Sequence, residues 1–198
     1  MNKLRFALAA ACLGLLTQPA VAQMGLGAGY EFIKAVRDRD GAKAHDLIDS
    51  NPPGILNSRD GDGSTPLMIA VSREDPLWTG FLITRGADVN LAGKGGDTPL
   101  IAAARVGFTE AVDWLLEAKA KVDASNRMGE TALIIAVQQR DAVLVKRLLA
   151  ARADPDKTDS AAGLSARDYA QRDTRSRQIL QLIEARKPKP VTAAATSR

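Results

Sequence analysis

The chain has 198 residues, a length typical of one domain, and 45% of its residues are hydrophobic while 25% are charged, as in ordinary globular proteins. Its net charge of +4 comes from the two ends, because residues 1–22 and 187–198 carry five cations and no acid. The part between them is nearly neutral, which argues against nucleic-acid binding, since that function needs a basic face on the folded domain.

The first 22 residues have the pattern of a secretory signal peptide. Lys3 and Arg5 precede an uncharged, largely apolar run over residues 6–16, and the small-residue site Ala20-Val21-Ala22 follows. We expect cleavage near Ala22 and export to the periplasm. The apolar run is too short for a stable membrane span, which takes about 20 residues, so no stable membrane insertion is expected.

The only cysteine, Cys12, lies inside this segment, so the mature chain has no disulfide and no thiolate ligand to offer. Residues 23–29 are expected to form a short linker, and residues 30–186 the folded domain. The tail at residues 187–198 contains two prolines and no apolar period, which predicts disorder.

The first part of the domain predicts two helices, at residues 31–36 and 42–49, followed by Ile55-Leu56-Asn57. The second of these helices contains His45, the only histidine of the chain. We interpret His45 as a surface residue, because no second histidine and no cysteine accompany it to form a metal or catalytic site.

A 33-residue repeat follows. Three segments begin alike, at residues 63–70, 96–103 and 129–136, and their threonines are Thr65, Thr98 and Thr131. Each repeat ends in a similar way as well, with Gly86-Ala-Asp-Val-Asn90 matching residues 119–123 and 152–156 at the same interval. Residues 163–170 begin a further copy, displaced by one inserted residue, and residues 178–185 predict its last helix.

The local chemistry of the repeat predicts where its helices begin and end. Thr65-Pro66 and Thr98-Pro99 combine a hydroxyl that can cap a helix with proline at the first helical position. Gly86 stands just after the second helix, where a positive φ is favoured. Lys119 and Arg152 occupy the same place, where a left-handed conformation costs on the order of 1 kcal/mol.

These motifs resemble the ankyrin repeat, with its Gly-x-Thr-Pro-Leu-His-x-Ala start, Leu-Leu pair and Gly-Ala-Asp-x-Asn end. The resemblance covers residues 30–186 and implies an all-α solenoid of stacked helix-turn-helix units with hairpin-like loops, about five units with degenerate caps. It departs from the family at the histidine, which is replaced by Met68, Ile101 and Ile134, so apolar packing is expected to join neighbouring repeats there.

Two loops superficially resemble ligand sites. Asp60-Gly-Asp-Gly-Ser64 has no downstream glutamate to complete a calcium loop, and Gly93-Lys-Gly-Gly96 lacks the rest of a phosphate loop. Both fall on turns of the repeat. We therefore expect no catalytic residue, no metal and no cofactor.

The resemblance implies that a partner protein binds the concave face, formed by the loop tips and the exposed face of the first helices. The candidate partner-binding residues are Arg73, Lys94, Asp97, Arg105, Arg127, Met128, Glu130, Gln138, Gln139 and Arg172. The arginines are the first choices for anchors, because arginine can bind carboxylates with two hydrogen bonds and is enriched at binding hot spots.

We expect a non-catalytic protein-protein interaction module that is exported to the periplasm. An immunity or inhibitor protein that blocks a toxin or hydrolase is the alternative, and it predicts a very tight complex with one enzyme. A binder of cell wall or of a small molecule also fits the sequence.

Overall fold

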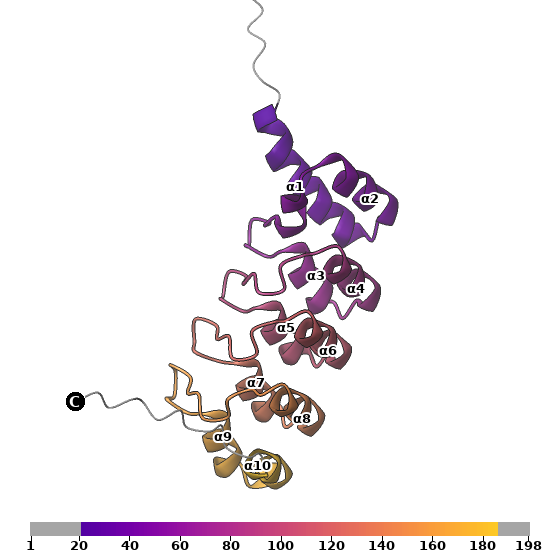
Figure 1. Cartoon of the computed structure of the whole chain (residues 1–198). Helices are drawn as coiled ribbons and strands as arrows, with labels where there is room; N and C mark the ends of the chain where they lie inside the picture. Colours follow the sequence, from indigo (N-terminus) through magenta and orange to yellow (C-terminus); the bar gives the residue numbers. More distant parts are fainter. Residues whose placement is uncertain (1–20, 186–198) are drawn as a thin grey trace, which may run out of the picture.

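The computed structural model describes residues 21–185, which form five helix pairs stacked along one axis (Figure 1). No strand occurs within this range; two short 3-10 helices and two isolated bridges accompany the α-helices. The first helices of the pairs are α1 (Val21–Asp38), α3 (Pro66–Ser72), α5 (Pro99–Val106), α7 (Ala132–Gln138) and α9 (Ala166–Arg172). The second helices are α2 (Gly41–Ser50), α4 (Pro76–Thr84), α6 (Thr109–Glu117), α8 (Ala142–Ala150) and α10 (Arg177–Glu184), and the 3-10 helices are η1 (Pro53–Asn57) and η2 (Thr174–Ser176).

The pairs build an all-helical solenoid, as the repeat predicts. Each first helix contacts the next along the stack, from α1 to α3, α5, α7 and α9. Long loops project from one side, and the first helices lie between these loops and the second helices (Figure 1). Each unit therefore buries its apolar face against its neighbours, which one helix pair alone cannot do.

The helices start where the sequence predicts. Thr65, Thr98 and Thr131 each accept a hydrogen bond, 3.2–3.3 Å long, from the backbone N–H of the third residue that follows. The two predicted prolines occupy the first turns of α3 and α5. In the last unit, Ser165 forms a reciprocal capping box with Asp168.

The predicted left-handed positions are also confirmed. Gly86 has a φ of 90°, while Lys119 and Arg152 have φ values of 67° and 69° at the equivalent places. The chain thus keeps the same turn after α4, α6 and α8, although only the first of the three turns contains glycine.

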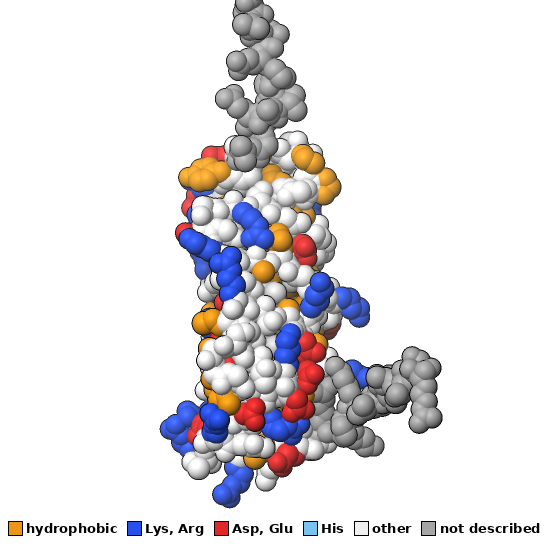
Figure 2. Space-filling view, turned by 90° about the vertical axis from the view of Figure 1, so that its left-hand side faces the viewer, with side chains coloured by type: hydrophobic (Ala, Val, Ile, Leu, Met, Phe, Trp, Pro, Cys, Tyr) orange, Lys and Arg blue, Asp and Glu red, His pale blue; other side chains and the backbone are white. Residues whose placement is uncertain are grey.

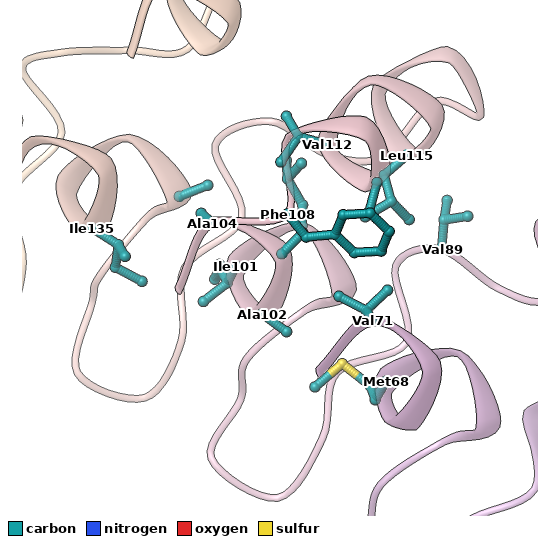
Figure 3. Close-up of a cluster of buried hydrophobic side chains, with 14 of the residues drawn as sticks. Met68, Val71, Val89, Ile101, Ala102, Ala104, Phe108, Val112, Leu115 and Ile135 are labelled. Atoms are coloured by element: carbon teal, nitrogen blue, oxygen red, sulfur yellow. The ribbon is translucent and has the colours of Figure 1, made fainter. Parts of the chain in front are cut away.

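Buried aliphatic side chains form a continuous core along the stack. Leu82, Leu115 and Leu148, which we expected between the repeats, are fully buried. Figure 3 shows the ring of Phe108 between α6 and Val71 of α3. The small residues expected at close helix contacts, Ala70, Ala102, Ala103 and Ala136, are exposed by 0–6%.

Neighbouring units are also joined by polar links that the sequence did not lead us to expect. Met68, Ile101 and Ile134 are buried, as expected for apolar packing in place of histidine. In addition, the side-chain oxygens of Asn57, Asn90 and Asp123 accept hydrogen bonds of 2.6–2.9 Å from backbone N–H groups of the following unit, those of Asp88, Lys121 and Asp154. Apolar packing is therefore only part of what joins the repeats.

The linker expected at residues 23–29 is instead part of α1. No proline interrupts the chain between Val21 and Asp38, and Gly29 lies where α1 passes η1 closely. A Cβ at Gly29 would lie 2.6 Å from Ser58 Oγ, so a larger residue there would require the Ser58 side chain to move. Residues 1–20, which hold most of the expected signal peptide, and residues 186–198, which hold the expected tail, lie outside the described residues.

Candidate functional site

Four loops line one side of the stack, at residues 58–65, 91–98, 124–131 and 157–165. In each, a backbone N–H near the start bonds a carbonyl near the end, as in Asn126 N to Glu130 O at 3.0 Å, so the loops are hairpin-like as expected. A glycine with positive φ follows each tip, and these tips abut. A Cβ at Gly96 would lie 2.9 Å from Arg127 N, and one at Gly129 would lie 2.5 Å from Ser160 N.

We call these loops, with the C-terminal ends of α3, α5, α7 and α9, the loop face. Figure 2 looks onto this side of the molecule. Lys and Arg side chains stand out over its upper, N-terminal half and lie beside Asp and Glu lower down. All ten candidate residues lie in these segments, but their side chains are in very different situations.

Arg105 is held within the protein. It donates to both carboxylate oxygens of Asp97 at 3.2 Å and to Glu130 Oε2 at 3.3 Å. Asn126 donates to the same two carboxylates at 2.8 Å. Burial lowers the pKa of Arg105, but the hydrogen bonds and charges of Asp97 and Glu130 outweigh it and hold this pKa above its ordinary value. Three candidates therefore form a network that fixes two neighbouring loops rather than a free binding surface.

Three further candidates connect neighbouring units. Arg73 Nη1 donates to the carbonyl of Arg37 at 2.6 Å, and Gln139 Nε2 donates to the carbonyl of Arg105 at 2.7 Å. Gln138 lies beside the hydroxyl of Tyr169. The charge of Arg73 stays available to a partner, because a carbonyl does not neutralise it, whereas the two glutamines serve the contacts between units.

The side chains of the remaining four candidates are exposed and take no part in the loop network or in the hydrogen bonds between units described above. Lys94, Arg127 and Arg172 form no ion pair within residues 21–185, and the Met128 side chain is 51% exposed at the tip beside Arg127. Cations and a methionine on a rigid support can bind carboxylates and adapt to an apolar surface.

Sequence reasoning missed Asn126 and Asp159, which occupy the same loop position 33 residues apart. Asn126 Oδ1 accepts the N–H groups of Met128 and Glu130. Asp159 accepts those of Ala162 and Gly163, and Tyr169 donates to it at 2.6 Å. Burial raises the pKa of Asp159, but these hydrogen bonds outweigh it and lower the pKa below its ordinary value. An Asn or Asp at the third position of these glycine-containing loops was the available signal.

The two loops that resemble ligand sites are used as turns. Asp60 Oδ1 accepts the N–H groups of Asp62 and Ser64, and its other oxygen pairs with Arg37. The 93–96 loop closes through Gly93 N and Asp97 O at 2.9 Å. Within residues 21–185, no three His, Cys, Asp or Glu side chains are grouped to hold a metal ion.

His45 lies away from the loop face, on α2. Its side chain is exposed, its ring is 5.0 Å from that of Phe81, and Arg85 Nη2 lies 2.9 Å from Nδ1. Trp78 also lines the small hollow beside it. No described helix is both long and apolar enough to cross a membrane.

The solenoid matches a known family of repeat proteins. The family model described as ankyrin repeats (3 copies) matches residues 32–126 and 67–159, which together span more than half of the chain. The chain belongs to the ankyrin-repeat family. The loops and first helices described above are therefore the parts that ankyrin repeats stack into a continuous face.

The ankyrin-repeat chain is also similar to the E3 ubiquitin-protein ligase XBAT33 of Arabidopsis thaliana. The two are 36% identical over 84 residues, which are 42% of this chain but 16% of the ligase. The likeness covers a small part of the ligase, and its activity is not carried over to this chain. Repeats of this family generally serve protein-protein interaction, so a protein partner is indicated.

Proposed function

We propose that this ankyrin-repeat chain is an exported, non-catalytic module that binds a partner protein through its loop face in the periplasm. The observation that carries the proposal is the contrast on this face between fixed and free side chains. Asp97, Arg105 and Glu130 hold two loops in place, while Lys94 and Arg127 project from the tips without an ion pair in the described range.

Such an arrangement suits binding, because a site is most effective when its supporting groups are locked and its contacting groups are already in position. Arg73 and Arg172 extend the exposed cationic positions along the first-helix ends of two further units. Met128 adds an apolar contact that can adapt in shape. A partner that covers several units could therefore reach charged and apolar contacts together.

The test is affinity capture from periplasmic extract with the purified protein and an Arg127/Arg172→Glu variant. Arg73 and Arg105 are left unchanged, since replacing Arg73 would break a hydrogen bond between units and replacing Arg105 would break the network that fixes the loops. A Lys146/Arg177→Glu variant is the matched control, because both residues are exposed on the second helices. We expect the control to retain the partner and the loop-face variant to lose it.

Equal capture by the two variants would place the partner elsewhere on the molecule. Capture by none of the proteins would favour a cell-wall or small-molecule ligand. A single enzyme captured almost irreversibly, with loss of its activity, would favour the inhibitor function.

Export rests on the pattern in residues 1–22 and has its own test. Mass spectrometry of the protein from the periplasmic fraction should give a chain that begins at Gln23. Recovery of the uncleaved chain from the cytoplasm alone would contradict this part of the proposal.

A further inference from the structure

The side of the stack away from the loop face is formed by the second helices (Figure 1). Between α2 and α4, the centre of the Phe81 ring lies 5.0 Å from that of the His45 ring, and the guanidinium carbon of Arg85 lies 5.2 Å from the centre of the same Phe81 ring. An aromatic ring at this place is therefore flanked by an imidazole from α2 and by a guanidinium at the end of α4.

Between α4 and α6, the same arrangement keeps the ring but lacks both of its neighbours. Trp114 and Ala118 stand 33 residues after the phenylalanine and the arginine, and Gly80 stands five residues after the cap of its helix, as the histidine does. A Cβ at Gly80 would meet nothing within 4 Å outside its own stretch of helix. The two small residues leave a hollow of about 280 Å³, which is lined by Gly80, Ile83, Thr84, Trp114, Glu117 and Ala118.

The hollow combines an aromatic ring with a carboxylate that has no counter-charge. The Trp114 ring packs edge to face against the ring of Phe108, with the ring centres 6.2 Å apart. Glu117 is exposed and forms no ion pair with any residue that the structure describes. Thr84 Oγ1 donates to the carbonyl of Gly80 at 2.8 Å, so its lone pairs can still accept a hydrogen bond. A cation is the group that the ring, the carboxylate and the hydroxyl oxygen all attract.

The places before and after this hollow in the stack each hold a guanidinium. Arg85 lies over an aromatic ring between α2 and α4, and Arg147 pairs with Asp113 between α6 and α8. The hollow between α4 and α6 has a ring and a carboxylate of its own, but no lysine or arginine of residues 21–185 lines it. The repeat itself therefore indicates which group completes this place.

We propose that the hollow between α4 and α6 binds an arginine side chain of a partner protein, with the guanidinium against Trp114 and paired with Glu117. Arginine fits this place better than lysine, because its planar group stacks on aromatic rings and is more weakly hydrated. The contact lies on the side opposite the loop face, so it adds to the proposed function without depending on it.

The test uses three blocked tripeptides that carry arginine, its uncharged isostere citrulline, or lysine between two glycines. Each is titrated into the ¹⁵N-labelled protein at low salt and followed by NMR. The arginine peptide should shift the indole N–H of Trp114 and the amides of residues 80–84 and 114–118 until they saturate, while the indole N–H of Trp78 stays in place. The citrulline peptide should bind at least about fivefold more weakly because it lacks the charge, and the lysine peptide should fall between the two.

Ala118→Arg should abolish binding of the arginine peptide, because it places a guanidinium beside Trp114, as Arg85 does in the preceding unit. Ala151→Arg, the same change one unit further along, is the matched control and should leave the affinity unchanged. Glu117→Gln keeps the size of the side chain and should weaken binding by about threefold, as expected for the loss of one exposed ion pair.

Equal binding of the arginine and citrulline peptides would show that charge plays no part and overturn the inference, and so would the absence of saturable shifts. Equal binding of the arginine and lysine peptides would show that the hollow does not select a guanidinium. Undiminished binding to folded Ala118→Arg would place the contact elsewhere. If Ala118→Arg fails to fold, an affinity that Glu117→Gln leaves unchanged overturns the inference instead. All of these results are independent of the capture experiment on the loop face.

Discussion

At the scale of single residues, the ends of the helices hold the least favourable backbone conformations. There, residues with side chains adopt the left-handed conformation that glycine favours. Within residues 21–185, five residues other than glycine have a positive φ. Lys119 and Arg152 take the place that Gly86 holds in its unit, and Glu74 and Arg140 take the place of Gly107. A left-handed conformation costs such residues roughly 1–2 kcal/mol each, so the turn is imposed by the packing on either side.

Replacing Lys119 or Arg152 by glycine should raise the free energy of unfolding by about 0.5–1 kcal/mol. Relief of the left-handed strain is larger than the added entropy that glycine gives the unfolded chain. Urea unfolding of each variant measures the change. Lys119→Ala is the control, since it keeps the strain and should bring no such gain, and a loss of stability in both glycine variants would contradict the strain.

Asp173 makes the last unit sensitive to acid. The backbone N–H of Arg175 and then the side chain of Arg140 lower the pKa of Asp173 to about 2. Because the folded pKa lies below the ordinary value of about 3.9, the stabilisation is complete above that value and is lost as the pH falls from about 4 to 2. Asp173→Asn should therefore lower the urea midpoint at neutral pH and flatten its decline in this window.

The measurement is a series of urea midpoints between pH 7 and pH 2 for the unchanged chain and the variant. Asp62→Asn, at an exposed loop tip, is the matched control and should follow the unchanged chain. An identical pH profile for Asp173→Asn and the unchanged chain would show that Asp173 contributes nothing to this decline.

At the scale of elements, the three middle units have a fully buried leucine in the second helix, and polar side chains fix their loops. Leu115 of α6 is fully buried, whereas Leu77, near the start of α4, is 82% exposed. Asn126 is 8% exposed and contacts both carboxylates of the loop network. The helices and the loops can therefore be weakened separately.

Leu115→Ala and Leu148→Ala should each cost about 2–5 kcal/mol of unfolding free energy, because the truncation removes buried apolar surface and leaves a cavity in a close-packed core. Thermal and urea unfolding measure the loss. Leu77→Ala, at an exposed site, should change stability by no more than about 0.5 kcal/mol. Comparable losses in all three variants would mean that the core is not where the structure places it.

Asn126→Ala should cost about 1–3 kcal/mol, since it leaves two backbone N–H groups without their acceptor and removes one of the two donors to the carboxylates of Asp97 and Glu130. The same variant should weaken capture of a loop-face partner, because the tip that carries Arg127 and Met128 loses its support. Ser125→Ala, an exposed neighbour, serves as the control. Unchanged stability would show that water replaces the side chain at no cost.

At the scale of the whole molecule, stability follows from the order of the units. Each unit packs on its neighbours in the stack, and the outer units have a neighbour on one side. Stability in such a stack is close to a sum of unit and interface contributions, so the ends open before the middle.

Amide hydrogen exchange should therefore be slowest in α5 and α7 and faster in α10, by at least tenfold if one interface contributes about 1.4 kcal/mol. Exchange followed by mass spectrometry under native conditions gives the protection of each helix. Uniform protection along the stack would mean that the five units open together as one cooperative block.

The fold could be predicted from the sequence because the 33-residue repeat recurs along the folded domain and can be read without knowing any contact. Thr65, Thr98 and Thr131 mark helix starts that the structure confirms, and the turn at Lys119 was predictable from its alignment with Gly86. The helical state of residues 23–29 was not, because this segment precedes the repeat and carries none of its markers.

The candidate site was predictable only in part. A period shows which positions are equivalent, but not which side chains pair across two units. Arg105 was chosen as an anchor, yet Asp97 and Glu130 hold it. Nothing in the sequence singled out Asn126, which donates to both carboxylates. Asp97 is 29 residues away from it, and Glu130 lies in the same turn.

The side chains of Asn57, Asn90 and Asp123 each link one unit to the next, and these links bear on how the stack responds to a pulling force. Tension applied along the stacking axis loads the interfaces in series, so the weakest one parts first and the others stay closed. Each released unit of 33 residues then adds about 110 Å of extended chain. Under such a load we expect the solenoid to lengthen one unit at a time, so that the loop face of the units still closed is retained.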